Sequence, residues 1–190
     1  MKEAKLYKFL RPIITGFYKV IFRPNIIGTE NIPASGRVIL AGNHTSNFDP
    51  PLLVSSTKRN IHFLAKKELW DGPQKIIFAN MGLIPVDRKN KDTNAVIMAE
   101  KYLKDEKLIG IFPEGTTEKT GELLKFKKGA VKMAIDTDSP IVPFVITGKY
   151  RLFSKNLTIK FLKPIKCSGN ILEETERLMN IIKEERENLR

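Results

Sequence analysis

Short apolar runs alternate along the chain with segments of helical periodicity, and this alternation restricts the fold more than any other feature. Strands are predicted where a short run is rich in β-branched or aromatic residues, at 37–42, 61–65, 82–86, 108–112, 140–146 and 157–162. Helices are predicted between and after them, at about 50–58, 73–80, 93–105, 127–137 and 171–188. Strands that alternate with helices predict an α/β fold, with a sheet covered by helices.

The chain has 190 residues, with no internal repeat, low-complexity tract or linker that would divide it. This length suffices for one domain with a real hydrophobic core. We expect residues 25–190 to form a single globular domain, preceded by a membrane-binding element at residues 1–24.

Residues 1–24 are basic and apolar, with apolar side chains at helical spacings. No small-residue cleavage site follows them, and Arg11 and Lys19 interrupt what would otherwise be a short apolar span. Pro12 predicts a division into two short amphipathic helices, because proline fits best in a first helical turn. These helices could pack on their own domain or lie in the surface of an anionic bilayer.

Aromatic residues next to lysines favour the bilayer, so we expect membrane contacts from four side chains: Phe9, Ile13, Phe17 and Phe22. The only cysteine, Cys167, excludes an internal disulfide and suits a reducing compartment. We therefore expect a peripheral protein at the cytoplasmic face of the cell membrane.

The net charge of +12 predicts an anionic partner, which could be nucleic acid, anionic lipid or a phosphorylated substrate. Aromatic RNA-binding signatures, zinc-finger spacings and Gly-rich phosphate loops are all missing from the sequence. Nucleic acid is therefore the weakest of the three options, and we expect no nucleic-acid partner.

The stretch "NHTSNFD" places His44 five residues ahead of Asp49, between a predicted strand and a predicted helix. Five residues correspond to about 500° of helical rotation, and in a strand an odd separation puts two side chains on opposite faces. The two side chains can meet only across a turn, which Thr45, Ser46 and Asn47 favour. A carboxylate beside an imidazole fixes its tautomer and leaves the other ring nitrogen free to remove a proton. The alternative is that His44 and Asp49 only cap a loop and a helix.

Other catalytic centres find little support. The sequence has no Gly-x-Ser-x-Gly elbow, and neither Cys167 nor His62 has a recognisable partner for a triad or a metal site. We therefore expect no metal and no bound cofactor, and a histidine base that acts on the hydroxyl group of the substrate itself.

Two further segments could bind an anionic substrate. "GIFPEGTTEKTG" contains Glu114 within a Pro- and Gly-containing turn after a strand, and "GLIPVDRKN" places Arg88 just past another strand. Four lysines follow the first of these segments and could neutralise a phosphate group or a bilayer, or could simply be solvated: Lys125, Lys127, Lys128 and Lys132.

Taken together, "NHTSNFD", "GLIPVDR", "FPEGT" and "SPIVPFVI" resemble the four ordered sequence blocks of the glycerolipid acyltransferase family. The nearest class is 1-acyl-sn-glycerol-3-phosphate (lysophosphatidate) acyltransferase, and the likeness covers roughly residues 25–148. The resemblance implies a mixed sheet, attachment to a membrane, His44 as general base and Asp49 as its orienting partner. It also implies binding of the glycerol phosphate acceptor by five residues: Lys66, Arg88, Glu114, Gly115 and Thr116. Where many members have arginine after "FPEGT", this chain has Thr117, and Lys119 or Lys125 could replace that charge.

The implied reaction moves a fatty acyl group from acyl-CoA or acyl-carrier protein to the sn-2 hydroxyl of lysophosphatidic acid, which gives phosphatidic acid in phospholipid biosynthesis. Backbone N–H groups of the turn after His44 could stabilise the oxyanion. Acylation of glycerol 3-phosphate at sn-1, or of another lysolipid, is the alternative within the family. A basic binding module without enzymatic activity would explain the charge, but it would leave the His44–Asp49 pair without a task.

Overall fold

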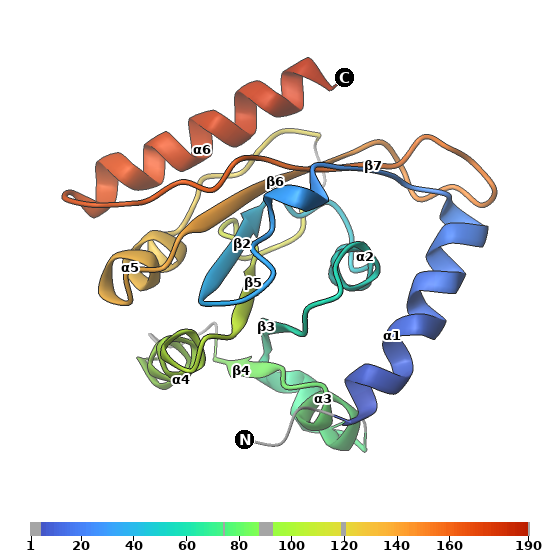
Figure 1. Cartoon of the computed structure of the whole chain (residues 1–190), viewed down its shortest axis with the longest axis horizontal. Helices are drawn as coiled ribbons and strands as arrows, with labels where there is room; N and C mark the ends of the chain where they lie inside the picture. Colours follow the sequence, from blue (N-terminus) through green and yellow to red (C-terminus); the bar gives the residue numbers. More distant parts are fainter. Residues whose placement is uncertain (1–4, 74, 88–92, 119–120, 190) are drawn as a thin grey trace.

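The computed structural model describes residues 5–73, 75–87, 93–118 and 121–189. Within them, seven strands form one sheet in the order β1-β7-β6-β2-β5-β3-β4 (Figure 1). The strands are β1 (Asn25–Ile27), β2 (Val38–Gly42), β3 (Ile61–Lys66), β4 (Ile84–Val86), β5 (Leu108–Ile111), β6 (Ile141–Thr147) and β7 (Thr158–Phe161). Neighbouring strands run parallel except β6 and β7, which pair antiparallel. The sheet is therefore mixed, and the predicted α/β class is confirmed.

Helices cover both faces of this sheet. In Figure 1, α4 (Thr93–Lys104), α5 (Gly129–Asp136) and α6 (Ile171–Asn188) lie on one side of it. On the other side lie α1 (Lys5–Phe17), the π-helix η1 (Tyr18–Phe22) and α2 (Asp49–Ser56). Three shorter helices connect strands: η2 (Thr29–Asn31), η3 (Lys67–Trp70) and α3 (Lys75–Asn80).

The central strand β2 is buried on both faces, as expected for a parallel strand with helices on either side. Side chains alternate along a strand, so Val38 and Leu40 enter the core that α1, η1 and α2 close. Ile39 and Ala41 enter the opposite core, beneath α4, α5 and α6. Because β2 is buried on both faces, the segment 37–42 contains no charged residue after Arg37.

The sequence predicted six of the seven strands, with ends within about two residues of those observed. It missed β1, because three residues are too few to establish a period of two. β1 forms only through its parallel pairing with β7, which follows it by more than one hundred residues. The strand is thus a product of tertiary pairing.

The prediction that Pro12 divides the N-terminal segment is wrong, because α1 continues through this residue. Tertiary hydrogen bonds hold the helix on both sides of the proline. Ahead of it, the Tyr7 hydroxyl donates to the Arg59 carbonyl over 3.1 Å, and the guanidinium Nε of Arg11 donates to the Thr57 carbonyl over 2.8 Å. Beyond it, the Tyr18 hydroxyl donates to the Phe48 carbonyl over 2.7 Å. The α-helical geometry ends instead at η1, which Arg23 terminates in a left-handed conformation (φ 46°).

The N-terminal segment has one face in the core and one face in solvent. Tyr7, Tyr18 and Phe22 belong to the same buried cluster as the strands, whereas Phe9, Ile13 and Phe17 are 66%, 55% and 50% exposed. The prediction that Phe22 contacts a membrane is therefore wrong, because its ring turns inward and packs on Tyr18 and Tyr150. No helix in the described ranges combines the length and the apolar character needed to cross a bilayer.

Candidate active site

The predicted catalytic and acceptor-binding residues that the structure describes gather at one edge of the sheet. The strands β2, β5, β3 and β4 are neighbours and run parallel, so their carboxyl ends lie side by side. His44 follows β2, Glu114 and Gly115 follow β5, and Lys66 ends β3. Ligands in open α/β sheets bind beyond the carboxyl ends of strands, so this edge is the place to look for chemistry.

His44 and Asp49 meet across the turn, as their spacing predicted. His44 Nδ1 lies 2.8 Å from Asp49 Oδ2, and the His44 ring stacks on Phe112 with 4.1 Å between ring centroids. Because a carboxylate only accepts, Nδ1 carries the proton and donates it. The other ring nitrogen, Nε2, has no hydrogen-bond partner within the described residues, and it remains available as a base.

The Asp49 carboxylate is fully buried and is surrounded by hydrogen-bond donors. Its Oδ2 atom also accepts from the backbone N–H of Thr45 at 2.6 Å and of Ser46 at 2.9 Å. Its Oδ1 atom accepts from the Thr45 hydroxyl at 3.1 Å and from the Tyr150 hydroxyl at 2.6 Å. The N–H groups of Thr45 and Ser46 are thus engaged with Asp49, and the expectation that N–H groups of this turn serve an oxyanion finds no support from these two.

The backbone of His44 is fixed from both sides by the segment after β5. Its N–H donates to Glu114 Oε1 over 2.7 Å, and its carbonyl accepts from the Glu118 N–H over 2.9 Å. His44 and Glu114 are 70 residues apart in sequence, and they meet because each follows one of two neighbouring strands, β2 and β5. The "FPEGT" turn therefore positions the histidine.

Glu114 is buried, and both of its carboxylate oxygens bind backbone groups. In addition to the His44 N–H, it accepts from the Leu124 N–H over 2.9 Å. Burial raises the pKa of Glu114 above its usual value, and the hydrogen bonds from His44 and Leu124 act in the opposite direction. Only 4% of Glu114 is exposed, and its carboxylate holds the backbone of two other segments in place. Binding of the acceptor by Glu114 stays a prediction.

Gly115 adopts a left-handed conformation with φ of 73°, where L side chains are strained. The Lys127 side chain lies against it, so that a Cβ atom at this position would come within 2.7 Å of Lys127 Nζ. The neighbouring Thr116 is exposed. The absence of a side chain at Gly115 thus lets Lys127 pack across the turn that holds His44. The ammonium group of Lys127 is the cation that this packing brings to the turn.

Lys66 is exposed at the carboxyl end of β3, where it lies opposite Val86 in the register with β4. This places its side chain at the same edge as His44. Arg88, the other predicted phosphate ligand, lies outside the described residues, as does Lys119. Lys125 is exposed.

Sequence reasoning missed two residues that organise this edge. Asn43 is fully buried, and its side-chain amide donates to the Ile146 carbonyl and accepts from the Ile146 N–H, at 2.9 and 2.8 Å. The sequence held one indication of this role, because Asn43 is a polar residue that directly follows the apolar strand β2. Tyr150 has no such signal, because its contact with Asp49 spans 101 residues. Burial raises the pKa of Tyr150, as does the nearby Asp49 carboxylate, so the phenol stays protonated as a donor.

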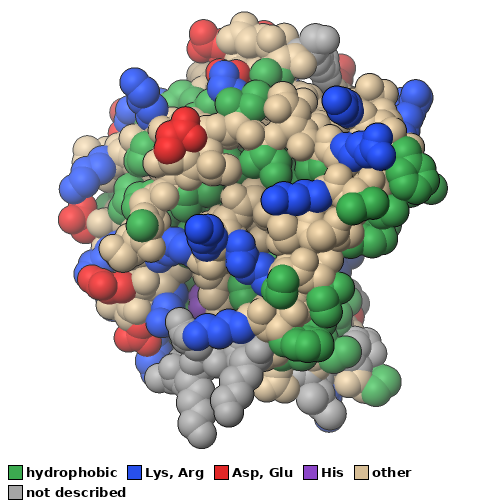
Figure 2. All heavy atoms as spheres, turned by 45° about the vertical axis from the view of Figure 1, so that its right-hand side comes forward, with side chains coloured by type: hydrophobic (Ala, Val, Ile, Leu, Met, Phe, Trp, Pro, Cys, Tyr) green, Lys and Arg blue, Asp and Glu red, His purple; other side chains and the backbone are tan. Residues whose placement is uncertain are grey.

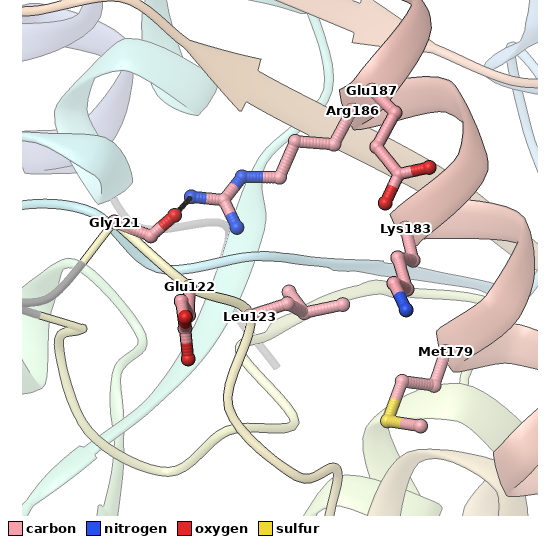
Figure 3. A pocket seen from close by; sticks show the side chains of 7 residues that line it. All are labelled: Gly121, Glu122, Leu123, Met179, Lys183, Arg186 and Glu187. Carbon is pink, nitrogen blue, oxygen red and sulfur yellow. Dashed lines mark hydrogen bonds between the residues drawn. The ribbon is translucent and has the colours of Figure 1, made fainter.

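A pocket elsewhere in the structure does not contain any of these residues. Figure 3 shows it between α6 and the loop at 121–123, lined by Gly121, Glu122, Leu123, Met179, Lys183, Arg186 and Glu187. Arg186 crosses it, donates to the Gly121 carbonyl over 3.0 Å and lies 3.7 Å from Glu118 Oε1. Helix α6 thereby holds the loop whose Glu118 N–H binds the His44 carbonyl.

The remaining reactive side chains are structural. His62 is buried in β3, bonds to the Gly82 carbonyl through Nδ1 at 2.8 Å and stacks on Tyr102. Burial raises the pKa of the Cys167 thiol to about 11, so the reactive thiolate is disfavoured. In the part of the chain that the structure describes, no three His, Cys, Asp or Glu residues are grouped as metal ligands would be.

The sequence is similar to a known protein family and to several of its members. A family model described as Acyltransferase matches residues 23–147. The 1-acyl-sn-glycerol-3-phosphate acyltransferase of Borreliella burgdorferi is 36% identical over 135 residues, which cover 70% of this chain and 54% of that protein. The protein of the same name from Bacillus subtilis is 31% identical over 148 residues, covering 75% of this chain and 72% of its own length.

A solved structure has the same fold. The 1-acyl-sn-glycerophosphate (LPA) acyltransferase PlsC from Thermotoga maritima aligns with a TM-score of 0.78 and 24% identity, over 100% of this chain and 83% of that one. The chain spans about half the length of several relatives it matches. On the matched residues and the shared fold, the chain belongs to the acyltransferase family.

Proposed function

We propose that the chain transfers a fatty acyl group from a thioester, acyl-CoA or acyl-carrier protein, to the sn-2 hydroxyl of lysophosphatidic acid. The observation that carries the proposal is the buried contact of 2.8 Å between His44 Nδ1 and Asp49 Oδ2, with Nε2 left without a protein partner in the described residues. The names of its relatives, 1-acyl-sn-glycerol-3-phosphate acyltransferases, support the choice of acceptor.

In the proposed reaction, the acceptor hydroxyl donates its hydrogen bond to His44 Nε2. The proton moves to Nε2 as the hydroxyl oxygen attacks the thioester carbonyl carbon, and the imidazolium that forms is stabilised by Asp49. A carbon–oxygen bond then replaces the carbon–sulfur bond. The departing thiolate takes up the proton that His44 holds, which returns the histidine to its neutral form.

Cations at the site support an anionic acceptor. Lys66 lies at the carboxyl end of β3, and the Lys127 ammonium group lies against Gly115 in the turn that binds the His44 backbone. We expect these two lysines, with Arg88 and the exposed Thr116, to hold the phosphate group. No metal or bound cofactor enters this reaction, so activity should survive treatment with EDTA.

We further propose that the protein works at the cytoplasmic face of a membrane as a peripheral protein. Its lysolipid substrate resides in a bilayer, and three apolar side chains of α1 are open to solvent: Phe9, Ile13 and Phe17. A helix with an apolar face and basic neighbours binds anionic bilayer surfaces. The net charge of +12 supports the same partner.

The test is transfer of a labelled acyl group to a panel of acceptors with both donors, compared between the wild type and His44→Ala. General-base catalysis contributes about 10²- to 10⁴-fold, so His44→Ala should lose at least about 10²-fold in rate. His62→Asn is the matched control, since the chain has two histidines and His62 lies in β3 away from Asp49. Near-normal transfer by His44→Ala would eliminate the proposed base. If glycerol 3-phosphate were the only acceptor that is acylated, the reaction would instead be acyl transfer to the sn-1 hydroxyl.

A further inference from the structure

We infer that the loop between β6 and β7, residues 148–157, is a second membrane-binding element that docks on an anionic bilayer together with α1 and η1. This inference rests on the proposed function, and it names the surface by which the site would meet its lipid. The loop carries two of the most exposed large apolar side chains of the described chain, Leu152 at 66% and Phe153 at 60%.

The loop is joined to the N-terminal segment. The Phe153 N–H donates to the Ile21 carbonyl over 2.5 Å, and the Arg23 guanidinium lies 5.9 Å from the centroid of the Phe153 ring. In Figure 1 the loop lies beside the end of α1, at the right of the molecule. Val20 of η1 is 58% exposed, so two segments far apart in sequence combine into one apolar surface.

Charge on this surface favours anionic lipid. Exposed cations surround the apolar side chains, namely Lys19, Arg23, Lys149, Arg151 and Lys155. Neither residues 5–29 nor residues 149–163 contain a single Asp or Glu. Figure 2 turns this side of the molecule forward and shows apolar side chains at its right-hand edge with Lys and Arg among them. Apolar side chains that insert and cations that bind headgroups are the two components of interfacial binding.

The same loop contacts the candidate active site. Tyr150 donates to Asp49 Oδ1 over 2.6 Å, and its ring packs on Phe48 with 5.5 Å between centroids. Phe48 directly precedes α2 and is 51% exposed. Docking of the loop would therefore place the His44–Asp49 pair close to the lipid surface. The rings of Phe48 and Tyr150 would lie between the pair and the bilayer.

The experiment uses the full chain and two double variants at exposed apolar positions. Leu152→Ser with Phe153→Ser removes the tip of the loop, and Ile97→Ser with Leu172→Ser is the matched control on α4 and α6, where these side chains are 57% and 52% exposed. Binding is measured by co-sedimentation with phosphatidylcholine vesicles, with and without phosphatidylglycerol. Since each inserted apolar side chain contributes to partitioning, the loop variant should bind mixed vesicles about tenfold more weakly or worse, and the control should bind as the wild type does.

Leu152→Ser alone serves as a second variant, because its side chain is open to solvent and has no ring contact to lose. It should also weaken vesicle binding, with an unchanged melting temperature. Equal binding by wild type and loop variants, while Phe9→Ser with Ile13→Ser binds weakly, would overturn the role of the loop and leave the proposed function intact. Equal binding to vesicles with and without phosphatidylglycerol would overturn the anionic preference. Vesicle binding without acyl transfer would instead count against the proposed function alone.

Discussion

Replacement of Asp49 by asparagine separates the charge of this residue from its shape. The Oδ2 atom accepts from three N–H groups, those of the His44 ring and of the Thr45 and Ser46 backbone. An asparagine must keep its oxygen on this side, because its NH₂ group would otherwise face three donors. The NH₂ group then lies beside the hydroxyls of Thr45 and Tyr150, which can both accept. Asp49→Asn should therefore fold, preserve the His44 tautomer and remove only the negative charge.

The size of the effect follows from the contact. A hydrogen bond to a charged group contributes about 1.5–3 kcal/mol. Attraction between two unit charges about 4 Å apart reaches about 4 kcal/mol at an effective dielectric constant of about 20. The imidazolium formed in the transition state should thus lose about 1.5–4 kcal/mol of stabilisation, which lowers the rate about 10- to 10³-fold.

The assay is release of free thiol from acyl-CoA at saturating lysophosphatidate, with the melting temperature measured in parallel. A loss of about 10⁴-fold, as large as that of a triad histidine held in the wrong tautomer, would refute the assigned orientation of the asparagine. A rate equal to that of the wild type would refute any role for Asp49 in catalysis. Thr57→Val, a change at a buried hydroxyl outside the site, controls for small losses of stability.

Two further predictions concern buried titratable groups. Glu114→Gln turns one acceptor into a donor that faces the N–H of His44 or Leu124, so the free energy of unfolding should fall by about 1–3 kcal/mol, measured by denaturant titration. An unchanged stability with a raised KM for the acceptor would instead make Glu114 a substrate ligand only. Burial lowers the pKa of His62 from its ordinary value of 6.5. As the pH falls, the imidazole of His62 is therefore protonated in the unfolded chain before it is protonated in the folded chain. The free energy of unfolding that is present above pH 6.5 is then lost below it. His62→Asn should lose less stability than the wild type between about pH 7 and about pH 5; equal losses in the two proteins would contradict this.

The pairing of His44 with Asp49 could be predicted because it is local. Their separation of five residues excludes a contact within a helix or a strand, and the residues between them favour a turn. The strand that precedes His44 was also predicted, because a short run rich in β-branched residues favours a strand. Local sequence therefore determined where a base could be built.

The role of Glu114 was only half predicted. Its turn was expected to lie at the site, and it does, but its carboxylate binds the backbone of His44 and Leu124. Glycine and proline in the sequence reveal a turn, whereas the partner of a carboxylate depends on which strand lies next to it. The pairing of β2 with β5, which a pattern of apolar residues does not specify, made that choice.

Sequence by itself determined the α/β class, most helices and strands, the turn that joins an imidazole to a carboxylate, and the basic charge, because each depends on spacing or composition. Only the tertiary structure decided that Tyr150 donates to Asp49, that Phe22 turns inward and that Pro12 lies within a continuous helix. These features depend on contacts between residues tens to more than one hundred positions apart. Such contacts form only when the two faces of the sheet are covered, and burial rather than local preference then selects them.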